Sequence, residues 1–333
     1  MKTKDTLNDF KNQLARQQMA GEVAMGVRKL SFEAFKRKAR EHQIDFRENE
    51  LGVGFYKYPN VLKLNDAKKG LIFFEGFRKE ILDELKKPVA PTSAVPSGQM
   101  LTNLLRSEHI PYNIFFPMRK DLEGCKRLFN KILGREEIAS ITDILIEYHP
   151  EPPEEYLDDR TAFDVYIPYF NQSNQSCGIG IEVKYTEKEY PLKLDSKEYK
   201  HVKDSTGKIC LSGAYLDVTR KCGYYKVGVS DDDLVSNKFR QIWRNHILGA
   251  SMVLRGVIAN FISITLYPQE NIHFSLDAMP KYKAMLKPEH YNSFVPLSYE
   301  NLFAEMETSL NLEHKEEWMA YLRRRYLFNM KFA

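Results

Sequence analysis

Two segments of the chain, residues 161–169 and 179–186, alternate between apolar and polar positions with the period of a β-strand. The apolar positions of the first segment are Phe163, Val165, Ile167 and Tyr169. Those of the second segment are Ile179, Ile181, Val183 and Tyr185. Each segment is therefore predicted to be a strand that buries one face. The opposite face carries Asp164 in the first strand, and Glu182 and Lys184 in the second.

A polar stretch, Asn171–Ser176, separates the two predicted strands and is suited to a hairpin loop. Asp164 and Glu182 lie equally far along the chain from Ser173. A hairpin that is symmetric about Ser173 therefore sets the two carboxylates directly opposite each other, with Cβ atoms about 5 Å apart. A slip of one residue would change this pairing, so the register is a hypothesis for the structure to test.

Further elements follow from the spacing of apolar residues elsewhere in the chain. Residues 99–115 have near-helical spacing, which Pro111 disrupts in its later part, and residues 141–148 are strand-like. A long helix is predicted from Ser230, an N-cap followed by three aspartates, to Leu254, and it ends at Gly256. Residues 257–267 form a buried strand. The predicted order is helix, three strands, helix, strand.

The flanking segments are predicted to be mainly helical. Residues 1–90 are rich in Lys, Arg and Glu, with a strand or turn section at 52–64, and the tail from Asn271 ends in the segment 318–328. A stretch with three prolines, residues 87–98, is typical of an exposed connector. We therefore expect an N-terminal extension (1–95), a core (96–270) and a C-terminal helical segment that packs on the core (271–333).

Composition limits the classes of protein to consider. With a net charge of +4 over 333 residues there is no global basic field, so any contact with nucleic acid must be local. Two basic patches, 36–40 and 323–325, could serve this purpose or be solvated helix faces. The sequence has no apolar stretch of membrane-spanning length, no secretory signal at its start and no CxxC pair among its four cysteines, which favours a cytoplasmic protein without membrane contact.

The opposed carboxylates indicate a type of chemistry. Two carboxylates at this separation repel each other unless a proton or a cation lies between them, and oxygen ligands suit Mg²⁺ or Mn²⁺. Lys184 can neutralise charge that develops on a phosphate, or help to orient and deprotonate water. The string Glu-x-Lys carries little information alone, because it recurs at Glu84, Glu198 and Glu313. The alternative is an ordinary surface hairpin with a polar cross-strand pair.

The order of elements favours the metal site over the plain hairpin. The predicted order is a helix, three strands, a crossover helix and a parallel strand. In this order the chain resembles the PD-(D/E)xK nuclease superfamily, whose core has the same αβββαβ arrangement. That superfamily carries its Asp on the second core strand and its (D/E)xK on the third, which matches Asp164 and Glu182-Val183-Lys184. A narrower resemblance, to a family of restriction-endonuclease-like proteins, rests on segments at 103–108, 113–117, 163–164, 180–187 and 241–246. It covers about residues 99–268, and Ala162-Phe163 stands where many members have a proline before the Asp.

The resemblance implies an α/β restriction-endonuclease-like fold and Mg²⁺- or Mn²⁺-dependent hydrolysis of phosphodiester bonds. The expected substrate is double-stranded DNA, cut by an endonuclease of restriction or genome-defence type, and cleavage of two strands would favour a homodimer. Asp164, Glu182, the carbonyl of Val183 and Glu108 are expected to hold the metal, with Lys184 as a catalytic partner. The alternatives are a non-catalytic nucleic-acid-binding module with the same fold, and a scaffold with no salt-dependent affinity for DNA.

Several side chains have two possible roles. Glu108 either completes the metal site from the first core helix or is exposed on that helix. Gln241, Arg244 and Asn245 are predicted to share one helix face. They either contact the phosphates of a nucleic-acid backbone or the lysine, or they form an ordinary polar helix face. His246 is more typical of a structural residue than of a base. Tyr185 and Trp243 are expected to pack in the core.

Overall fold

The computed structural model describes residues 31–87, 92–93, 98–189, 192–194 and 196–328, and every structural statement below concerns these residues. The helices predicted within residues 1–30 and most of the predicted connector at 87–98 lie outside them. 

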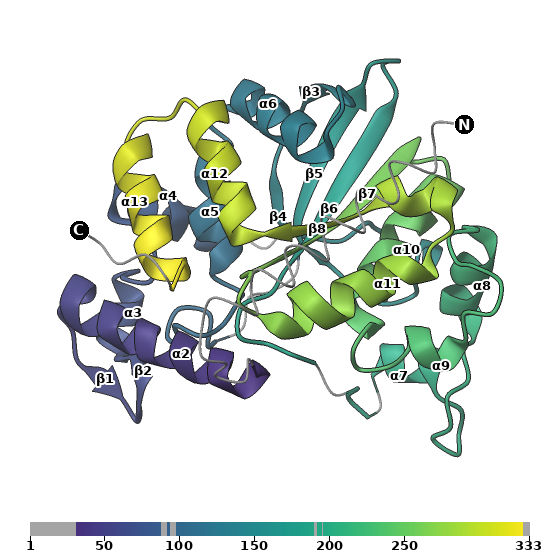
Figure 1. Ribbon diagram of the computed structural model, residues 1–333, viewed down its shortest axis with the longest axis horizontal. Helices are drawn as coiled ribbons and strands as arrows, with labels where there is room; N and C mark the ends of the chain where they lie inside the picture. The colour runs from purple at the N-terminus through teal and green to yellow at the C-terminus, as the bar shows by residue number, and fades with distance from the viewer. Residues whose placement is uncertain (1–30, 88–91, 94–97, 190–191, 195, 329–333) are drawn as a thin grey trace, which may run out of the picture.

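The centre of the molecule is a six-stranded mixed sheet in the order β3-β5-β6-β7-β8, with β4 also paired to β5 (Figure 1). β3 and β4 both run antiparallel to β5, as does β6, whereas β7 is parallel to β6 and β8 is parallel to β7. The strands are β3 (Ile138–Ile141), β4 (Leu145–Tyr148), β5 (Phe163–Asn171), β6 (Ser176–Val183), β7 (Asn260–Tyr267) and β8 (Phe294–Ser298).

The hairpin between β5 and β6 has the predicted register. Val165 pairs with Ile181 and Ile167 with Ile179, which places Ser173 at the centre of the connection. Asn171 Oδ1 accepts hydrogen bonds from the backbone N–H groups of Ser173, at 3.0 Å, and Gln175, at 2.9 Å, so the polar loop closes on itself. Short side-chain oxygens that bond to a nearby backbone in this way favour tight turns.

Helices cover both faces of the sheet (Figure 1). On one face lie α5, α6 and α12, and on the other lie α8, α10 and α11. The helices are α2 (Phe32–Asp45), α3 (Leu64–Lys68), α4 (Glu75–Leu85), α5 (Ile110–Met118), α6 (Leu122–Leu133), α7 (Lys197–Val202), α8 (Gly213–Lys221), α9 (Asp231–Leu234), α10 (Arg240–Leu254), α11 (Met279–Met285), α12 (Tyr299–Ser309) and α13 (Lys315–Tyr326). Shorter π- and 3₁₀-helical segments are Phe46–Leu51, Pro153–Glu155, His273–Ala278 and Pro288–Ser293.

The two faces of the sheet have separate hydrophobic clusters. The apolar positions of β6 all join the cluster beneath α5, as the alternation predicted. In β5, Val165, Ile167 and Tyr169 join the same cluster, but Phe163 packs on the opposite face with Tyr166. Phe163 takes that position because Gly180 has no side chain: a Cβ there would lie 2.6 Å from the Phe163 ring.

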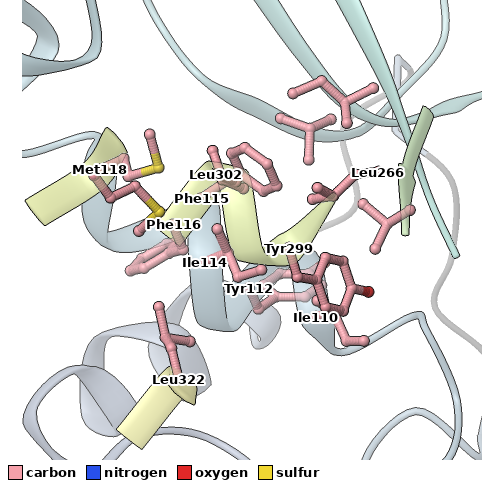
Figure 2. Packing of buried hydrophobic residues seen from close by; sticks show 14 of the residues in the cluster. Ile110, Tyr112, Ile114, Phe115, Phe116, Met118, Leu266, Tyr299, Leu302 and Leu322 are labelled. Atoms are coloured by element: carbon pink, nitrogen blue, oxygen red, sulfur yellow. The ribbon is translucent and has the colours of Figure 1, made fainter. Parts of the chain in front are cut away.

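Helix α5 is the centre of the larger cluster. All nine of its residues are buried, which is expected of a helix that is apolar all round. Figure 2 shows its side chains packed beside Leu266 of β7, Tyr299 and Leu302 of α12, and Leu322 of α13.

Both terminal segments pack against this same cluster. Phe46 and Phe77 from the N-terminal part, and Trp318 and Tyr326 from α13, are buried in it. The Trp318 indole N–H donates to the carbonyl of Asn113 in α5 at 2.8 Å. Helix α13 and the N-terminal part of the chain therefore share one apolar interior with α5.

A second, two-stranded sheet lies in the N-terminal part, where the sequence predicted a strand or turn section at 52–64. It consists of β1 (Phe55–Tyr56) and β2 (Tyr58–Leu62), joined by a tight turn with Lys57 at φ 60°. β2 is also tied to the loop before α5, because Leu62 N–H donates to Thr102 at 2.8 Å.

Two of the predicted helices have different bounds. Residues 99–108 form turns, and the helix begins only at Ile110, because Pro111 belongs to its first turn, where a missing N–H costs nothing. The helix predicted from Ser230 to Leu254 is divided into α9 and α10. Ser230 caps α9 as expected, but the intervening Ser236 and Asn237 favour turns over helix.

Two predicted features of the strands also differ. Of the strand predicted at 141–148, only Leu145–Tyr148 forms a strand, β4, whereas Ile141 ends the separate strand β3, which begins at Ile138; both strands pair with β5. The tail was predicted to be mostly helical, yet it contributes β8, an edge strand of the main sheet. The helix, three-strand, helix and strand order remains, so the predicted α/β restriction-endonuclease-like fold is confirmed.

Candidate active site

Three neighbouring strands place three carboxylates level with one another. The pairing of Val165 with Ile181 brings Asp164 of β5 beside Glu182 of β6. On the other side of β5, Ile146 pairs with Val165 and Tyr148 with Phe163, which brings Glu147 of β4 level with Asp164. The row Glu147, Asp164, Glu182 therefore crosses the sheet perpendicular to its strands.

Glu182 connects this row to Lys184 and to helix α10. Its Oε1 accepts a hydrogen bond from the Lys184 ammonium, and its Oε2 accepts one from the Asn245 amide. The Lys184 ammonium also donates to Oε1 of Gln241. Glu182 and Lys184 are only 8% and 4% exposed, so these contacts hold both side chains in a desolvated position. The predicted contact between Gln241 and the lysine is present.

The charge of the row is unfavourable when all its members are ionised. Burial raises the pKa of Asp164 well above its ordinary value, and the negative charges of Glu182 and Glu147 add to this effect. The Lys184 charge and the Val183 N–H, which donates to Asp164 Oδ2 at 2.6 Å, act to lower this pKa but do not outweigh the burial. Burial, with the charges of Glu182 and Glu108, raises the pKa of Glu147 to about 8. The site therefore favours a proton or a cation among its oxygens.

Glu108 lies in the turn before α5, next to this row. Its negative charge contributes to the raised pKa of Glu147, and its carboxylate pairs with Arg106 at 2.7 Å. The turn is held in place by Glu187, which accepts from the N–H of Ser107 at 3.0 Å and from that of Tyr185 at 2.7 Å. We refer to Glu108, Glu147, Asp164 and Glu182 as the carboxylate cluster.

The terminal segments reach the backbone around Lys184. The Tyr299 hydroxyl, from α12, donates to the Lys184 carbonyl at 2.8 Å. From α2, Gln43 donates its amide to the Tyr185 hydroxyl at 2.7 Å. The Lys184 N–H donates to the Leu266 carbonyl in β7 at 2.8 Å. Elements from both ends of the chain thus fix the residue that follows β6.

Not every polar residue of α10 meets the cluster. Asn245 does, and Gln241 bonds to Lys184 beside the cluster. Arg244 instead belongs to a separate ion-pair network with Asp159, at 2.9 Å, and Glu198, at 3.0 Å. His246 is fully buried between the Tyr282 hydroxyl and Ser293, and burial lowers its pKa to about 3, so it is a structural residue. Tyr185 and Trp243 are buried as predicted.

Glu147 is the residue of the cluster that sequence reasoning missed. Glu147 lies in the part of the predicted strand that forms β4. An acidic side chain between Ile146 and Tyr148 could have indicated that this strand also contributes to the site. The Glu147 backbone adopts φ 57°, which is uncommon for a residue other than glycine. Strain of this kind is frequent where a side chain must be directed into a site.

A hard divalent cation fits the chemistry of this donor set. Within the described residues, no three His, Cys, Asp or Glu side chains converge closely enough to hold a metal ion as they stand. The buried oxygens of Asp164 and Glu182 are nevertheless adjacent, carboxylates are the ligands that Mg²⁺ and Mn²⁺ prefer, and a cation would relieve the repulsion that raises the pKa of Asp164.

Comparison with known proteins identifies the family. A sequence model of one family in the PD-(D/E)XK nuclease superfamily matches residues 31–328. The chain belongs to this superfamily. The match extends beyond the segment 99–268 on which the motif resemblance rested, and it includes both terminal segments that pack on the core. No curated protein and no solved structure matches the chain.

Membership in the PD-(D/E)XK superfamily implies a nuclease whose substrate is nucleic acid, and such nucleases generally use divalent metals. Asp164 lies on β5, Glu182 and Val183 lie on β6, and Lys184 follows β6 directly. No helix among the described residues is long and apolar enough to cross a membrane.

The raised pKa of Glu147 predicts how stability depends on pH in the metal-free protein. Glu147 ionises near pH 8 when folded and near its ordinary value of 4.5 when unfolded. Between these pH values the folded state binds more protons than the unfolded state, so the free energy of unfolding falls as pH rises. We expect urea unfolding in EDTA to show this decline, and Glu147→Gln to reduce its slope. An equal slope in both proteins would contradict the assignment.

Proposed function

We propose that this superfamily member is a DNA endonuclease that requires Mg²⁺ or Mn²⁺ and cuts double-stranded DNA. The observation that carries the proposal is the row Glu147, Asp164, Glu182 with the Lys184 ammonium bonded to its last member. The motif segments around residues 103–117 and 241–246 favour a restriction or genome-defence role. Cutting of both strands would then call for two copies of the chain.

Asp164, Glu182 and the carbonyl of Val183 would hold the metal, and Glu108 and Glu147 would move toward it to complete its surroundings. A divalent cation, when bound, polarises a phosphoryl oxygen and lowers the pKa of water. Its charge also replaces the proton that the carboxylate cluster otherwise retains at neutral pH.

Lys184 supplies the positive charge that the protein itself brings to the reaction. Its ammonium can donate a hydrogen bond to a phosphate oxygen as negative charge develops there, and it can orient the attacking water. Gln241 accepts from this ammonium and Asn245 donates to Glu182, so both act as positioning residues. No covalent intermediate with the protein is needed for this chemistry.

The complete set of side chains favours the proposal over a non-catalytic module. A module that only bound nucleic acid would have no use for a desolvated lysine paired with a carboxylate. Burying such a pair costs several kcal/mol per ion unless hydrogen bonds compensate, which Gln241 and Asn245 provide here.

The test is digestion of circular and linear DNA side by side in Mg²⁺, Mn²⁺ and EDTA, together with metal-induced shifts in melting temperature. We expect cleavage of both substrates with either metal, none in EDTA, and a rise in melting temperature on adding metal. Asp164→Asn should lose both the cleavage and the rise. Tight DNA binding without any metal affinity would favour the non-catalytic module instead, and cleavage only from free ends would indicate an exonuclease.

A further inference from the structure

Within the part of the chain that the structure describes, the most exposed aromatic residues gather on the β1–β2 hairpin. Phe55, Tyr56 and Tyr58 are 46%, 56% and 63% exposed. Among the described residues, every other large hydrophobic side chain with comparable exposure is aliphatic. Figure 1 shows the hairpin protruding from the body of the molecule at the lower left, beyond α2 and α3. Three exposed rings on so short an element indicate a contact surface rather than chance.

The hairpin is held rigidly in place. Arg47, which is 3% exposed, donates from Nε to the Pro59 carbonyl at 2.7 Å and from a terminal nitrogen to the Val53 carbonyl. One buried guanidinium thus ties the segment that leads into β1 to the start of β2. The backbone that carries the rings is therefore fixed, so little backbone entropy is lost when they bind a partner.

Positive charge accompanies the aromatic rings. The Lys57 ammonium lies 5.2 Å from the centre of the Tyr56 ring. The Arg47 guanidinium lies 5.2 Å from the centre of the Phe55 ring, but it is buried and paired with Glu48 at 2.6 Å, so Lys57 carries the charge that a partner can reach. The whole segment from Gly52 to Leu64 contains no acidic residue. Flat rings interleaved with cations fit a polyanion with flat bases better than they fit an apolar protein surface.

The hairpin is also connected directly to the candidate active site. Leu104 N–H donates to the Asn60 carbonyl of β2 at 3.0 Å, and the next residue, Leu105, accepts at 3.0 Å from Thr186, two residues beyond Lys184. From strand rise and residue spacing, Tyr58 lies within about 25 Å of Lys184. This is shorter than one turn of a duplex, about 34 Å, so one nucleic-acid molecule can reach both places.

We propose that the β1–β2 hairpin binds an unpaired nucleic-acid strand next to the carboxylate cluster by stacking bases on Phe55, Tyr56 and Tyr58. The choice of nucleic acid as the partner rests on the proposed function, but binding through the hairpin requires no cleavage. It assigns to the N-terminal part of the chain a role in holding a substrate that contains unpaired bases, such as a single strand or a frayed end.

The binding test uses fluorescence anisotropy in EDTA, with a labelled single-stranded oligonucleotide and the matching duplex. We expect the single strand to bind more tightly than the duplex. Tyr56→Ala and Tyr58→Ala should each weaken single-strand binding at least about 5-fold, as the loss of one base stack does. Tyr56→Phe should retain affinity, whereas Tyr56→Leu should lose it, because Leu is apolar but offers no flat ring.

Controls separate the hairpin from the active site and from protein contacts. Leu276→Ala, a change at another exposed apolar residue, should leave DNA binding unaltered. Single-strand binding that is unchanged in a Tyr56→Ala, Tyr58→Ala double variant, with cleavage still metal-dependent, would overturn the hairpin proposal but not the nuclease. If the wild-type protein binds single strands through the hairpin but cleaves no DNA, the hairpin proposal stands and the proposed nuclease function is rejected. A double variant that changes only the oligomeric state would identify the rings as a protein interface, which also overturns the proposal.

Discussion

Lys184→Met is expected to lower kcat/KM for DNA cleavage by a factor of about 10²–10³, as removal of one preorganised charged donor does in other hydrolases. The Lys184 ammonium is desolvated and bonded to Glu182, so it is already in place before substrate arrives. A donor that is fixed in advance needs no reorganisation as charge develops on the phosphate. Methionine keeps the length of the side chain and its packing, so loss of the charge is the main change.

The measurement is the initial rate of plasmid cleavage at fixed Mg²⁺, with melting temperature recorded for each variant. Lys221→Met, which removes an exposed lysine of α8, should cleave like the wild type. Gln241→Ala should reduce the rate less than Lys184→Met, because it removes a partner of the ammonium but not the charge itself. A folded Lys184→Met protein that cleaves within threefold of the wild-type rate would reject the role proposed for this residue.

The part of the site that the sequence could predict is the part built from local alternation. The apolar positions of β6 are buried against α5, and side chains alternate along a strand. Glu182, at an alternate position, therefore points to the opposite face of the sheet. The polar loop at Asn171 then sets the register, so Asp164 and Glu182 could be paired from residue numbers alone. Helix periodicity likewise placed Gln241 and Asn245 on one side of α10, and both contact the predicted site.

What the sequence could not predict depends on contacts between distant segments. Glu147 joins the row only because β4 pairs with β5, and its left-handed backbone departs from simple alternation. The tertiary partners Gln43 and Tyr299 come from opposite ends of the chain, where no local pattern indicates a connection to Lys184. Arg244 shared a helix face with Gln241 by periodicity, yet the buried acids beside it determined where its guanidinium lies.

Arg244→Met is expected to destabilise the protein by about 3–5 kcal/mol, because it leaves the buried Asp159 without its counter-charge. Asp159 Oδ2 accepts from Arg244 at 2.9 Å and from the Tyr215 hydroxyl at 2.6 Å. Burial alone would raise the pKa of Asp159, but the Arg244 charge and hydrogen bonds from Thr161 and Tyr215 outweigh it and hold that pKa below its ordinary value. Glu198 bonds both Arg244 and Arg240, which fixes α7 against α10.

This prediction is checked by urea unfolding at neutral pH. Arg220→Met provides the matched control, because Arg220 and Asp231 form an ion pair that is 54% and 30% exposed, and its loss should cost less than about 1 kcal/mol. Asp159→Asn in the Arg244→Met background should recover part of the lost stability, since it removes the uncompensated charge. Because Asn245 follows Arg244 directly on α10, a shift of this helix also withdraws the amide from Glu182, so kcat should fall along with stability. An Arg244→Met protein that unfolds within about 1 kcal/mol of the wild type would show that the network contributes little to stability.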